Sequence, residues 1–299
     1  MTLVLEATAA PHVWVALAEE GGAHAEAAAV LQAELAGKTE ISAARWQTLF
    51  DGKTATPDLI VTVGVAALDG TLERLAQKDA SWARIPVLAT LLPQAVFDAR
   101  MASGPVVQRP FSAAVLDQPL GRQMALIKRA LPRRQLIGVL VGAQSQSLLG
   151  GLDKEARARG MILVSAPTIG APETIYPALK LVLNDAEVIL ALPDPVVYHG
   201  ASLQNILLTT YRVRVPLVAF SPAYVKAGAV LAVYSTPEQV ARRAVEMIGN
   251  WLAGRGLPPP QMPREFTVTA NSKVAASLGL KLDDPAEIAE DLRRQEGGK

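Results

Sequence analysis

The sequence contains no cysteine among its 299 residues, and aromatic residues make up only 5% of it. The lack of cysteine excludes disulfides, thiol catalysis and thiolate metal ligands. Only three histidines occur, His12, His24 and His199, and none has a partner at the spacing of metal ligands. A metal site built on Asp194 and His199 would need a third ligand from a distant part of the chain. We therefore expect no metal and no cofactor.

An excess of charge of one sign is also missing. The 29 basic and 28 acidic residues leave a net charge of +1, so we expect no nucleic-acid partner. No apolar run reaches the roughly 18 residues that a membrane-spanning helix needs. Residues 2–13 lack the basic start and the apolar core of a secretion signal. Two alternatives follow: the protein is cytosolic, or Met1 stands in place of a removed leader.

The common catalytic motifs are missing as well. The sequence has no phosphate loop with its lysine, no Gly-x-Ser-x-Gly elbow, no His-Glu-x-x-His and no Gly-x-Gly-x-x-Gly after the first predicted strand. The segment GAQSQSLLGG, residues 142–151, is flanked by glycine but lacks the lysine and the spacing of a phosphate loop. These absences favour a binding protein over an enzyme.

What the sequence does contain is a repeated alternation of strand and helix patterns. Half of the residues are apolar, which is enough for a core in each of two lobes of ordinary domain size. Apolar runs without alternation predict strands buried on both faces, as in parallel sheets covered by helices. In the first hundred residues such runs occupy residues 12–17, 59–64 and 85–92, and each precedes a helical pattern. Residues 41–50 predict a further strand or a helix, and the pattern leaves this choice open.

A second series of the same kind follows a break at Gly104-Pro105. A strand within residues 105–116 is expected to leave the first lobe, and five more apolar runs then alternate with helices at residues 136–142, 161–168, 186–194, 215–220 and 229–235. This alternation predicts a second doubly wound sheet. After a Pro-rich linker and a strand at 264–271, a small helix is expected at 272–279 and a frayed, solvated helix in the charged tail.

Two α/β lobes of this kind would leave a cleft between them. Loops at the carboxyl ends of parallel strands bind ligands in open α/β sheets, so both lobes would contribute loops to the cleft. Closure about a few hinge segments would then bury a small ligand.

Several segments together resemble one known family. They are DLIVTVG at 58–64, IPVL at 85–88, LDQPLGRQMALIKRALPRRQLIGVLVG at 116–142, and the run from RVPLVAF to SLGL at 214–280. This pattern, spread over residues 57–280, resembles the substrate-binding components of ABC transporters, in the family that includes tryptophan- and tyrosine-type binding proteins. The resemblance implies the type I periplasmic binding protein fold: α/β, with two Rossmann-like lobes, each a parallel sheet flanked by helices, joined by a three-segment hinge.

The resemblance also implies where the lobes divide and what the protein does. Residues 1–111 and 237–265 would form the first lobe, and residues 112–236 and 266–299 the second. The protein would be periplasmic, with its leader removed, and would pass a small organic solute to an inner-membrane ABC permease. An alternative from another class is a sensor or assembly partner that binds a protein such as an outer-membrane receptor. A third is a cytosolic ligand-responsive regulator, although no helix-turn-helix segment precedes His12.

The sequence departs from the family at two first-lobe positions. Amino-acid binders of the family usually carry Thr after the glycine that ends the LIVTVG-type strand, and Asp-Pro after the IPVL-type strand. Here Val65 follows Gly64, and Leu92-Pro93 replaces Asp-Pro. A zwitterion needs partners for both charges, because a buried unpaired charge is costly. We therefore expect a pocket that is more apolar than an amino-acid site.

The predicted ligand contacts come from the ends of strands in both lobes. In the first lobe they are Glu20, Gly21, Gly64, Val65 and Leu92. In the second they are Gln144, Ser145, Asp194, Tyr198, Ser221, Tyr224 and Tyr234.

Each of these residue types suits a particular contact, and each also has a structural alternative. Glycine permits a close backbone approach, and the serines and glutamines from Gln144 to Ser147 could donate to an anion at a helix N-terminus. Asp194, held between two prolines, is predicted as the main charged contact, with helix N-capping as the alternative. The tyrosines could stack on a flat ligand or pack in the core. Ser221 and Thr236 could equally be helix caps.

Overall fold

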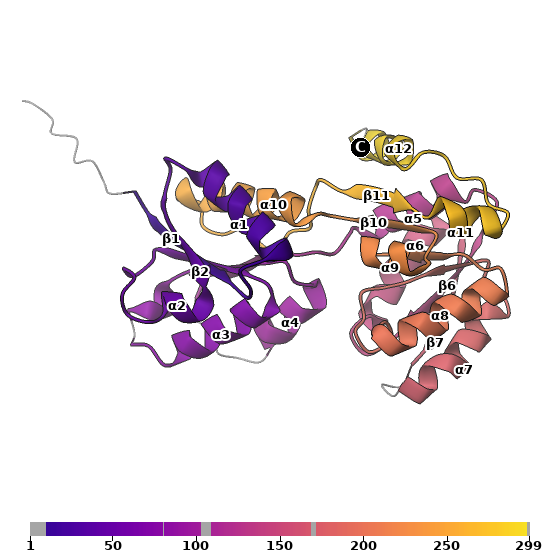
Figure 1. The fold of residues 1–299 in the computed structure, drawn as a ribbon, viewed down its shortest axis with the longest axis horizontal. Helices are drawn as coiled ribbons and strands as arrows, with labels where there is room; N and C mark the ends of the chain where they lie inside the picture. The colour runs from indigo at the N-terminus through magenta and orange to yellow at the C-terminus, as the bar shows by residue number, and fades with distance from the viewer. Residues whose placement is uncertain (1–9, 80, 103–108, 169–171, 298–299) are drawn as a thin grey trace, which may run out of the picture. The chain divides into compact units, whose positions relative to one another are not determined.

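The structure is a computed structural model that describes residues 10–79, 81–102, 109–168 and 172–297 (Figure 1). The chain divides into two compact units. Unit 1 comprises Met1–Leu116 and Ser235–Glu265, and unit 2 comprises Asp117–Tyr234 and Phe266–Lys299. The chain therefore passes from one unit to the other three times. Most of the opening segment considered for a signal, and the start of the strand expected after Gly104-Pro105, lie outside the described residues.

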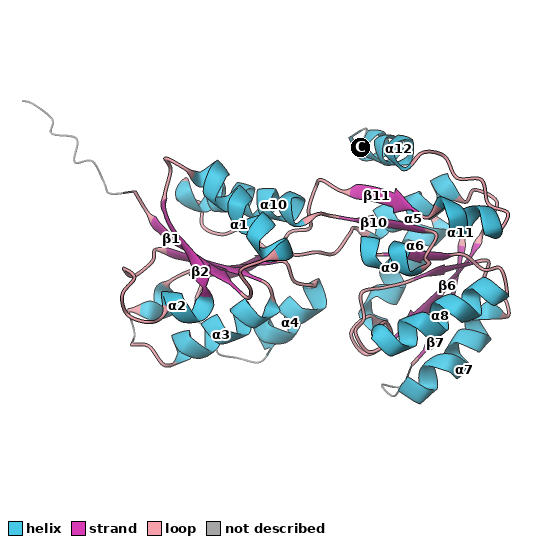
Figure 2. Ribbon diagram, in the orientation of Figure 1, coloured by secondary structure: helices cyan, strands magenta, loops and turns pink. Residues whose placement is uncertain are grey.

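Unit 1 is built on a five-stranded parallel sheet in the order β2-β1-β3-β4-β5 (Figure 2). Its strands are β1 (His12–Leu17), β2 (Glu40–Arg45), β3 (Leu59–Val63), β4 (Val87–Thr90) and β5 (Phe111–Ala114). Its helices are α1 (Gly22–Leu35), α2 (Trp46–Leu49), α3 (Val65–Ala76), α4 (Gln94–Ala102) and α10 (Pro237–Leu252). The cores on the two faces are separate: α1 and α10 cover one face, and α2, α3 and α4 cover the other.

Three details of unit 1 bear on expectations from the sequence. The segment at residues 41–50 holds both a strand and a helix, because β2 runs directly into α2. β5 belongs to the sheet of unit 1, so the chain leaves this unit after Leu116, a few residues beyond the expected boundary at residue 111. Thr236 caps α10, as its alternative role predicted: its hydroxyl accepts a hydrogen bond from the Gln239 backbone N–H at 3.3 Å.

Unit 2 has a six-stranded sheet in the order β11-β10-β9-β8-β6-β7, in which only the edge strand β11 is antiparallel. Its strands are β6 (Leu136–Val141), β7 (Ile162–Pro167), β8 (Val188–Leu190), β9 (Leu217–Ala219), β10 (Leu231–Tyr234) and β11 (Thr267–Ala270). Its helices are α5 (Leu120–Ala130), α6 (Leu149–Arg157), α7 (Pro172–Leu183), α8 (Gly200–Arg212), α9 (Pro222–Ala227), α11 (Ser272–Ser277) and α12 (Pro285–Gly297).

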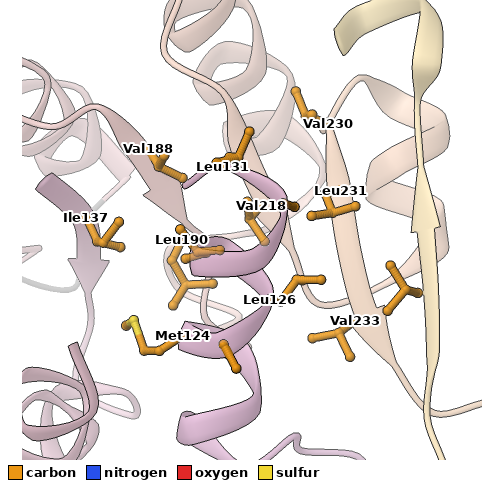
Figure 3. Packing of buried hydrophobic residues seen from close by; sticks show 14 of the residues in the cluster. Met124, Leu126, Leu131, Ile137, Val188, Leu190, Val218, Val230, Leu231 and Val233 are labelled. Atoms are coloured by element: carbon orange, nitrogen blue, oxygen red, sulfur yellow. The ribbon is translucent and has the colours of Figure 1, made fainter. Parts of the chain in front are cut away.

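The two faces of this sheet also carry separate cores. On one face α5, α6, α11 and α12 supply the buried side chains, and on the other α7, α8 and α9 do so. Figure 3 shows Met124 and Leu126 of α5 among strand residues such as Leu190 and Val218. All four side chains are at most 1% exposed. Such burial of continuous apolar strands on both faces is what the sequence pattern predicted.

In both units the first strand lies between the second and the third strand of the sheet. In unit 1 the chain goes from β1 outward to β2 and then returns to β3 on the other side, and in unit 2 it goes from β6 to β7 and returns to β8. The order therefore reverses between β1 and β3, and again between β6 and β8. In doubly wound sheets the loops at the carboxyl ends of two such strands form the usual ligand site.

The C-terminal tail is helical, as expected, but it is not solvated along its whole surface. Ile288, Ala289 and Leu292 of α12 are buried against unit 2. The Arg122 guanidinium, which is nearly fully buried, donates two hydrogen bonds of 2.7 Å to the Glu296 carboxylate. The expectation of a frayed, solvated helix was therefore wrong. The sequence is misleading here because only three residues of the helix make the apolar contact, and charged residues surround them.

This docking makes a prediction about stability. Leu292→Ala should lower the free energy of unfolding by about 2–4 kcal/mol, because the side chain is buried and the substitution leaves a cavity. Urea denaturation would measure the change. The matched control is Glu290→Ala on the exposed face of the same helix, which should alter stability by less than about 0.5 kcal/mol. Equal stability of the two variants would contradict the docking of α12.

No helix in the described part of the chain is long and apolar enough to cross a membrane.

Candidate functional site

In unit 2 the point where the strand order reverses is organised by one carboxylate, that of Asp194. Its Oδ2 accepts hydrogen bonds from the Ser145 backbone N–H at 3.1 Å and from the Ser145 hydroxyl at 2.8 Å. Its Oδ1 accepts one from the Val196 backbone N–H at 3.0 Å. The residue is 1% exposed. The loops that follow β6 and β8 are therefore tied together by Asp194.

Gly142, at the end of β6, is required for this arrangement. A Cβ added to Gly142 would lie 2.6 Å from Oδ2 of Asp194, which is closer than such atoms approach in proteins. The Gly142 backbone N–H also donates to the Ser145 hydroxyl at 3.1 Å. The carboxylate thus fills the space that a side chain at residue 142 would need. Three hydrogen bonds within the protein, together with burial, favour a structural role for Asp194 over that of a direct ligand acceptor.

Asp194 does not cap the helix that follows it, which was its predicted alternative. The residue at the N-cap of α8 is His199, whose backbone N–H donates to the Ser202 hydroxyl at 3.0 Å. Instead, Asp194 stabilises the turn that precedes the helix, because the Tyr198 backbone N–H donates to its carbonyl oxygen at 2.8 Å.

Three aromatic side chains gather at the ends of neighbouring strands in unit 2. The Phe220 ring, directly after β9, lies 4.8 Å from the Tyr224 ring and 6.2 Å from the Tyr198 ring. The Tyr224 hydroxyl donates to the Tyr198 carbonyl oxygen at 2.8 Å. Tyr234, the last residue of β10, is half-buried against the same hydrophobic cluster. We call Tyr198, Phe220, Tyr224 and Tyr234 the aromatic group.

The Tyr198 hydroxyl is buried and has no hydrogen-bond partner among the described residues. Burial raises its pKa well above the ordinary value for tyrosine, with smaller contributions from Tyr224 and Asp194. Burial also raises the pKa of Tyr224 and of Tyr234. These hydroxyls therefore stay protonated at neutral pH. Tyr224 and Tyr234 are half-buried and present neutral surface, whereas Tyr198 is buried, with 4% of its surface exposed.

The other predicted residues of unit 2 are near the same strand ends but are less constrained. Gln144, Gln146 and Ser147 are exposed in the loop after β6. Ser221 occupies the N-cap position of α9 and is half-buried, but its side chain makes no capping hydrogen bond. These groups are free to contact a ligand, whereas Ser145 is committed to Asp194.

In unit 1 the predicted residues divide between surface and core. Glu20 and Gly21 are exposed after β1, and Val65 is half-buried at the start of α3. Leu92 is fully buried in the core beneath α3 and α4, so its side chain is not presented at the strand end.

Gly64, between β3 and α3, has a positive φ of 94° that glycine adopts without strain. A Cβ there would lie 2.5 Å from Nε2 of His24, so His24 packs directly over this glycine. Pattern reasoning gave His24 no role, and nothing in the local sequence pairs it with Gly64, forty residues later.

Two further features at the end of β4 were not predicted. Leu91 has a positive φ of 55°, a conformation that is strained for a residue with a side chain. The neighbouring Thr90 hydroxyl is fully buried and has no partner among the described residues. Strain and an unsatisfied hydroxyl side by side are typical of functional loops. Four residues at these strand ends were missed by the sequence analysis: His24, Thr90, Leu91 and Phe220. Of these, only Phe220 carries a signal in the sequence, because it is an aromatic residue that ends an apolar run.

A groove of about 790 Å³ lies elsewhere in unit 2, between α5, α6 and α12. None of the predicted ligand residues lines it. The Arg122 and Arg159 side chains in its wall pair with Glu296 and Glu155, so its charges are largely satisfied within the protein.

Among the described residues, no group of three or more His, Asp or Glu side chains could hold a metal ion.

Comparison with solved structures shows the class of fold. A ligand-free, open substrate-binding protein with adhesive properties from Clostridium difficile superposes with a TM-score of 0.66 at 15% identity, covering 92% of this chain and 96% of that one. A Streptococcus pneumoniae ABC domain in complex with L-Trp gives 0.60 at 15% identity, with 93% and 98% covered. A periplasmic ribose ABC transporter protein from Conexibacter woesei gives 0.50 at 14% identity, with 95% and 98% covered. The fold is that of type I periplasmic binding proteins.

The sequence itself then identifies the family. The family model of ABC transporter substrate-binding proteins matches residues 114–288, which is more than half of the chain. The chain therefore belongs to the ABC transporter substrate-binding protein family. No curated protein sequence matches it.

The arrangement around Asp194 yields a prediction that separates a structural carboxylate from a free one. Gly142→Ala should lower the free energy of unfolding by about 1–3 kcal/mol, because its Cβ displaces the carboxylate. In an Asp194→Ala background the same substitution should cost much less, since the colliding oxygens are absent, and urea denaturation of all four proteins would measure this coupling.

Gly150→Ala is the matched control, because no atom lies within 4 Å of its added Cβ. This substitution should leave stability unchanged or raise it slightly, since alanine favours the helix. If Gly142→Ala behaves like Gly150→Ala, the carboxylate does not occupy the space beside residue 142.

Proposed function

We propose that the protein is the solute-binding component of an ABC importer. In this proposal it captures a small organic ligand as its two units close, and it delivers the ligand to an inner-membrane permease. Membership of the substrate-binding protein family is the observation that carries the proposal. The doubly wound sheet of each unit supports it, because each sheet presents strand-end loops of the kind that bind ligands.

We further propose that the ligand is neutral or weakly polar and has a flat, apolar surface. The aromatic group supports this, since aromatic rings favour stacked or edge contacts with flat molecules. The Asp194 carboxylate is occupied by hydrogen bonds within the protein, so it is not available to an ammonium group. In unit 1, Val65 and Leu92 offer no polar group where amino-acid binders of the family carry them.

The proposed contacts fall into two roles. Tyr224 and Tyr234 supply apolar surface, and the buried Tyr198, whose carbonyl oxygen accepts from the Tyr224 hydroxyl, supports Tyr224 from the core. Gln144, Ser221 and Glu20 supply hydrogen bonds. Gly21, Gly64, Val65 and Leu92 shape the unit 1 loops, and Asp194 with Ser145 holds the unit 2 loops in position.

We also propose a periplasmic location. Proteins of this family act outside the cytoplasm, and a chain without cysteine suits an oxidising compartment.

A second candidate function is that of a sensor or assembly partner that binds another protein, such as an outer-membrane receptor. Large apolar side chains exposed on the outer helices of unit 2, among them Leu208 at 48% and Tyr211 at 45%, favour it. Solute capture and protein binding are compatible, because these helix residues are not among the proposed ligand contacts.

Native mass spectrometry of the purified protein tests solute capture. We expect a discrete additional mass that disappears after denaturation and refolding. Refolded protein should then show a thermal shift with at least one neutral aromatic or heterocyclic compound in a metabolite panel. Absence of both the bound mass and any thermal shift would contradict solute binding and favour the protein-partner function.

Tyrosine variants test the proposed ligand chemistry. Tyr224→Ala and Tyr234→Ala should each weaken binding of the compound found above by about tenfold or more, because each removes ring contacts. Isothermal titration calorimetry would measure the affinity. Tyr176→Ala is the matched control: Tyr176 is 50% exposed on α7, and its loss should leave the affinity unchanged. Unchanged affinity in all three variants would show that the aromatic group is not the binding surface.

A further inference from the structure

A second surface of unit 2 has the properties of a protein-docking site. A groove of about 250 Å³ is lined by residues of α8, the end of α9 and α11. Figure 1 labels these three helices. The apolar lining of the groove comes from Leu207, Leu208 and Tyr211 of α8, Gly228 after α9, and Val274 of α11. We call this feature the α8–α11 groove.

The apolar side chains at this groove are unusually exposed. Leu208 and Tyr211, which both line it, are 48% and 45% exposed. Contiguous apolar surface of this kind on a water-soluble face marks interaction sites, since its exposure to water is unfavourable. A partner that covered these two side chains would gain from their burial.

Exposed positive charge lies next to the lining residues of the groove along the chain. Arg212 follows Tyr211 of the lining, Lys226 precedes Ala227 of the lining, and Arg214 lies two residues beyond Arg212; all three cations are exposed. Lys273 of α11 adds a fourth exposed cation. None of the four forms an ion pair with any residue that the structure describes. A partner that fits this border carries negative charge.

The groove lies at the opposite end of the sheet from the proposed ligand loops. β11 is antiparallel to β10, so its last residue, Ala270, pairs with Leu231 at the start of β10. Asn271 then holds α11 at this end, because its backbone N–H donates to the Val230 carbonyl oxygen at 2.9 Å. Asp194 and Tyr234, by contrast, lie at the carboxyl ends of the parallel strands. Docking at the groove therefore leaves the ligand loops of unit 2 accessible.

We propose that the α8–α11 groove binds an acidic amphipathic helix of a partner protein. Such a helix would place apolar side chains, one turn apart, over Leu208 and Tyr211 and would direct carboxylates toward Lys226, Lys273 and Arg212. A second copy of this chain would bring the same positive border and be repelled. A flat membrane surface would not enter a concave groove. This proposal does not depend on solute capture, because the groove shares no residue with the proposed ligand contacts.

Fluorescence anisotropy with a designed helical peptide tests the proposal. The probe carries leucines one turn apart on one face and glutamates on both sides of them, and its counterpart carries lysines in place of the glutamates. We expect the glutamate peptide to bind the full chain with a micromolar dissociation constant that rises with salt, and the lysine peptide not to bind. Lack of binding by the glutamate peptide, or equal binding of the two peptides, would overturn the proposal.

Variants on the surface of unit 2 locate the binding. Lys226→Glu combined with Lys273→Glu should weaken binding of the glutamate peptide by about tenfold or more, and Tyr211→Ser should do the same by removing an apolar contact. The matched control is Lys154→Glu, an exposed lysine of α6, a helix that does not line the α8–α11 groove; this variant should bind normally. Circular dichroism and the thermal midpoint check that each variant is folded.

The same variants also test two other occupants of the groove, a membrane surface and a second copy of the chain. Binding to phosphatidylglycerol vesicles that is lost in the double lysine variant, without peptide binding, would assign the surface to a membrane and overturn the proposal. Self-association in sedimentation that is lost in Tyr211→Ser would assign it to a second copy and overturn it as well. Solute binding should be the same in all of these variants.

Discussion

Burial of a parallel sheet on both faces is the constraint on which the rest of each unit depends. Strands such as β3 and β6 are apolar along their whole length, so helices must cover both faces. The chain must then alternate between strand and helix, which places one set of loops at the carboxyl ends of the strands and the other at the amino ends. The proposed ligand loops of unit 2 belong to the first set, and the α8–α11 groove lies at the second. The proposed ligand loops and the proposed docking groove therefore lie at opposite ends of the sheet of unit 2.

In both units, a side chain from another segment packs tightly against a glycine at the point where the strand order reverses. In unit 2 the Asp194 carboxylate occupies the space beside Gly142, and in unit 1 the His24 ring lies over Gly64. Both contacts need glycine at a strand end, but their chemistry differs. The contact in unit 2 is a charged hydrogen-bond network that fixes two loops, while that in unit 1 is a packing contact beside the strained Leu91.

The protein belongs to the ABC transporter substrate-binding protein family. Its ligand within that family depends on its own residues. Its solved relatives share only about one residue in seven with it, so their ligands do not transfer. Tyr224, Tyr234 and the apolar Val65 support the proposal of a ligand that is less polar than a zwitterion. The exposed apolar residues of α8 add a surface that solute capture does not use.

The sequence by itself determined the alternation of strands and helices, because burial on both faces imposes a local apolar pattern that can be read residue by residue. It left residues 41–50 open, since a short strand passes into a short helix without a break, and it predicted a solvated tail because α12 has few apolar residues. Only the tertiary structure decided the role of Asp194, whose partner Ser145 lies 49 residues away. The same holds for His24 over Gly64 and for the conformation of Leu91. These features depend on contacts between distant segments, and no local pattern encodes them.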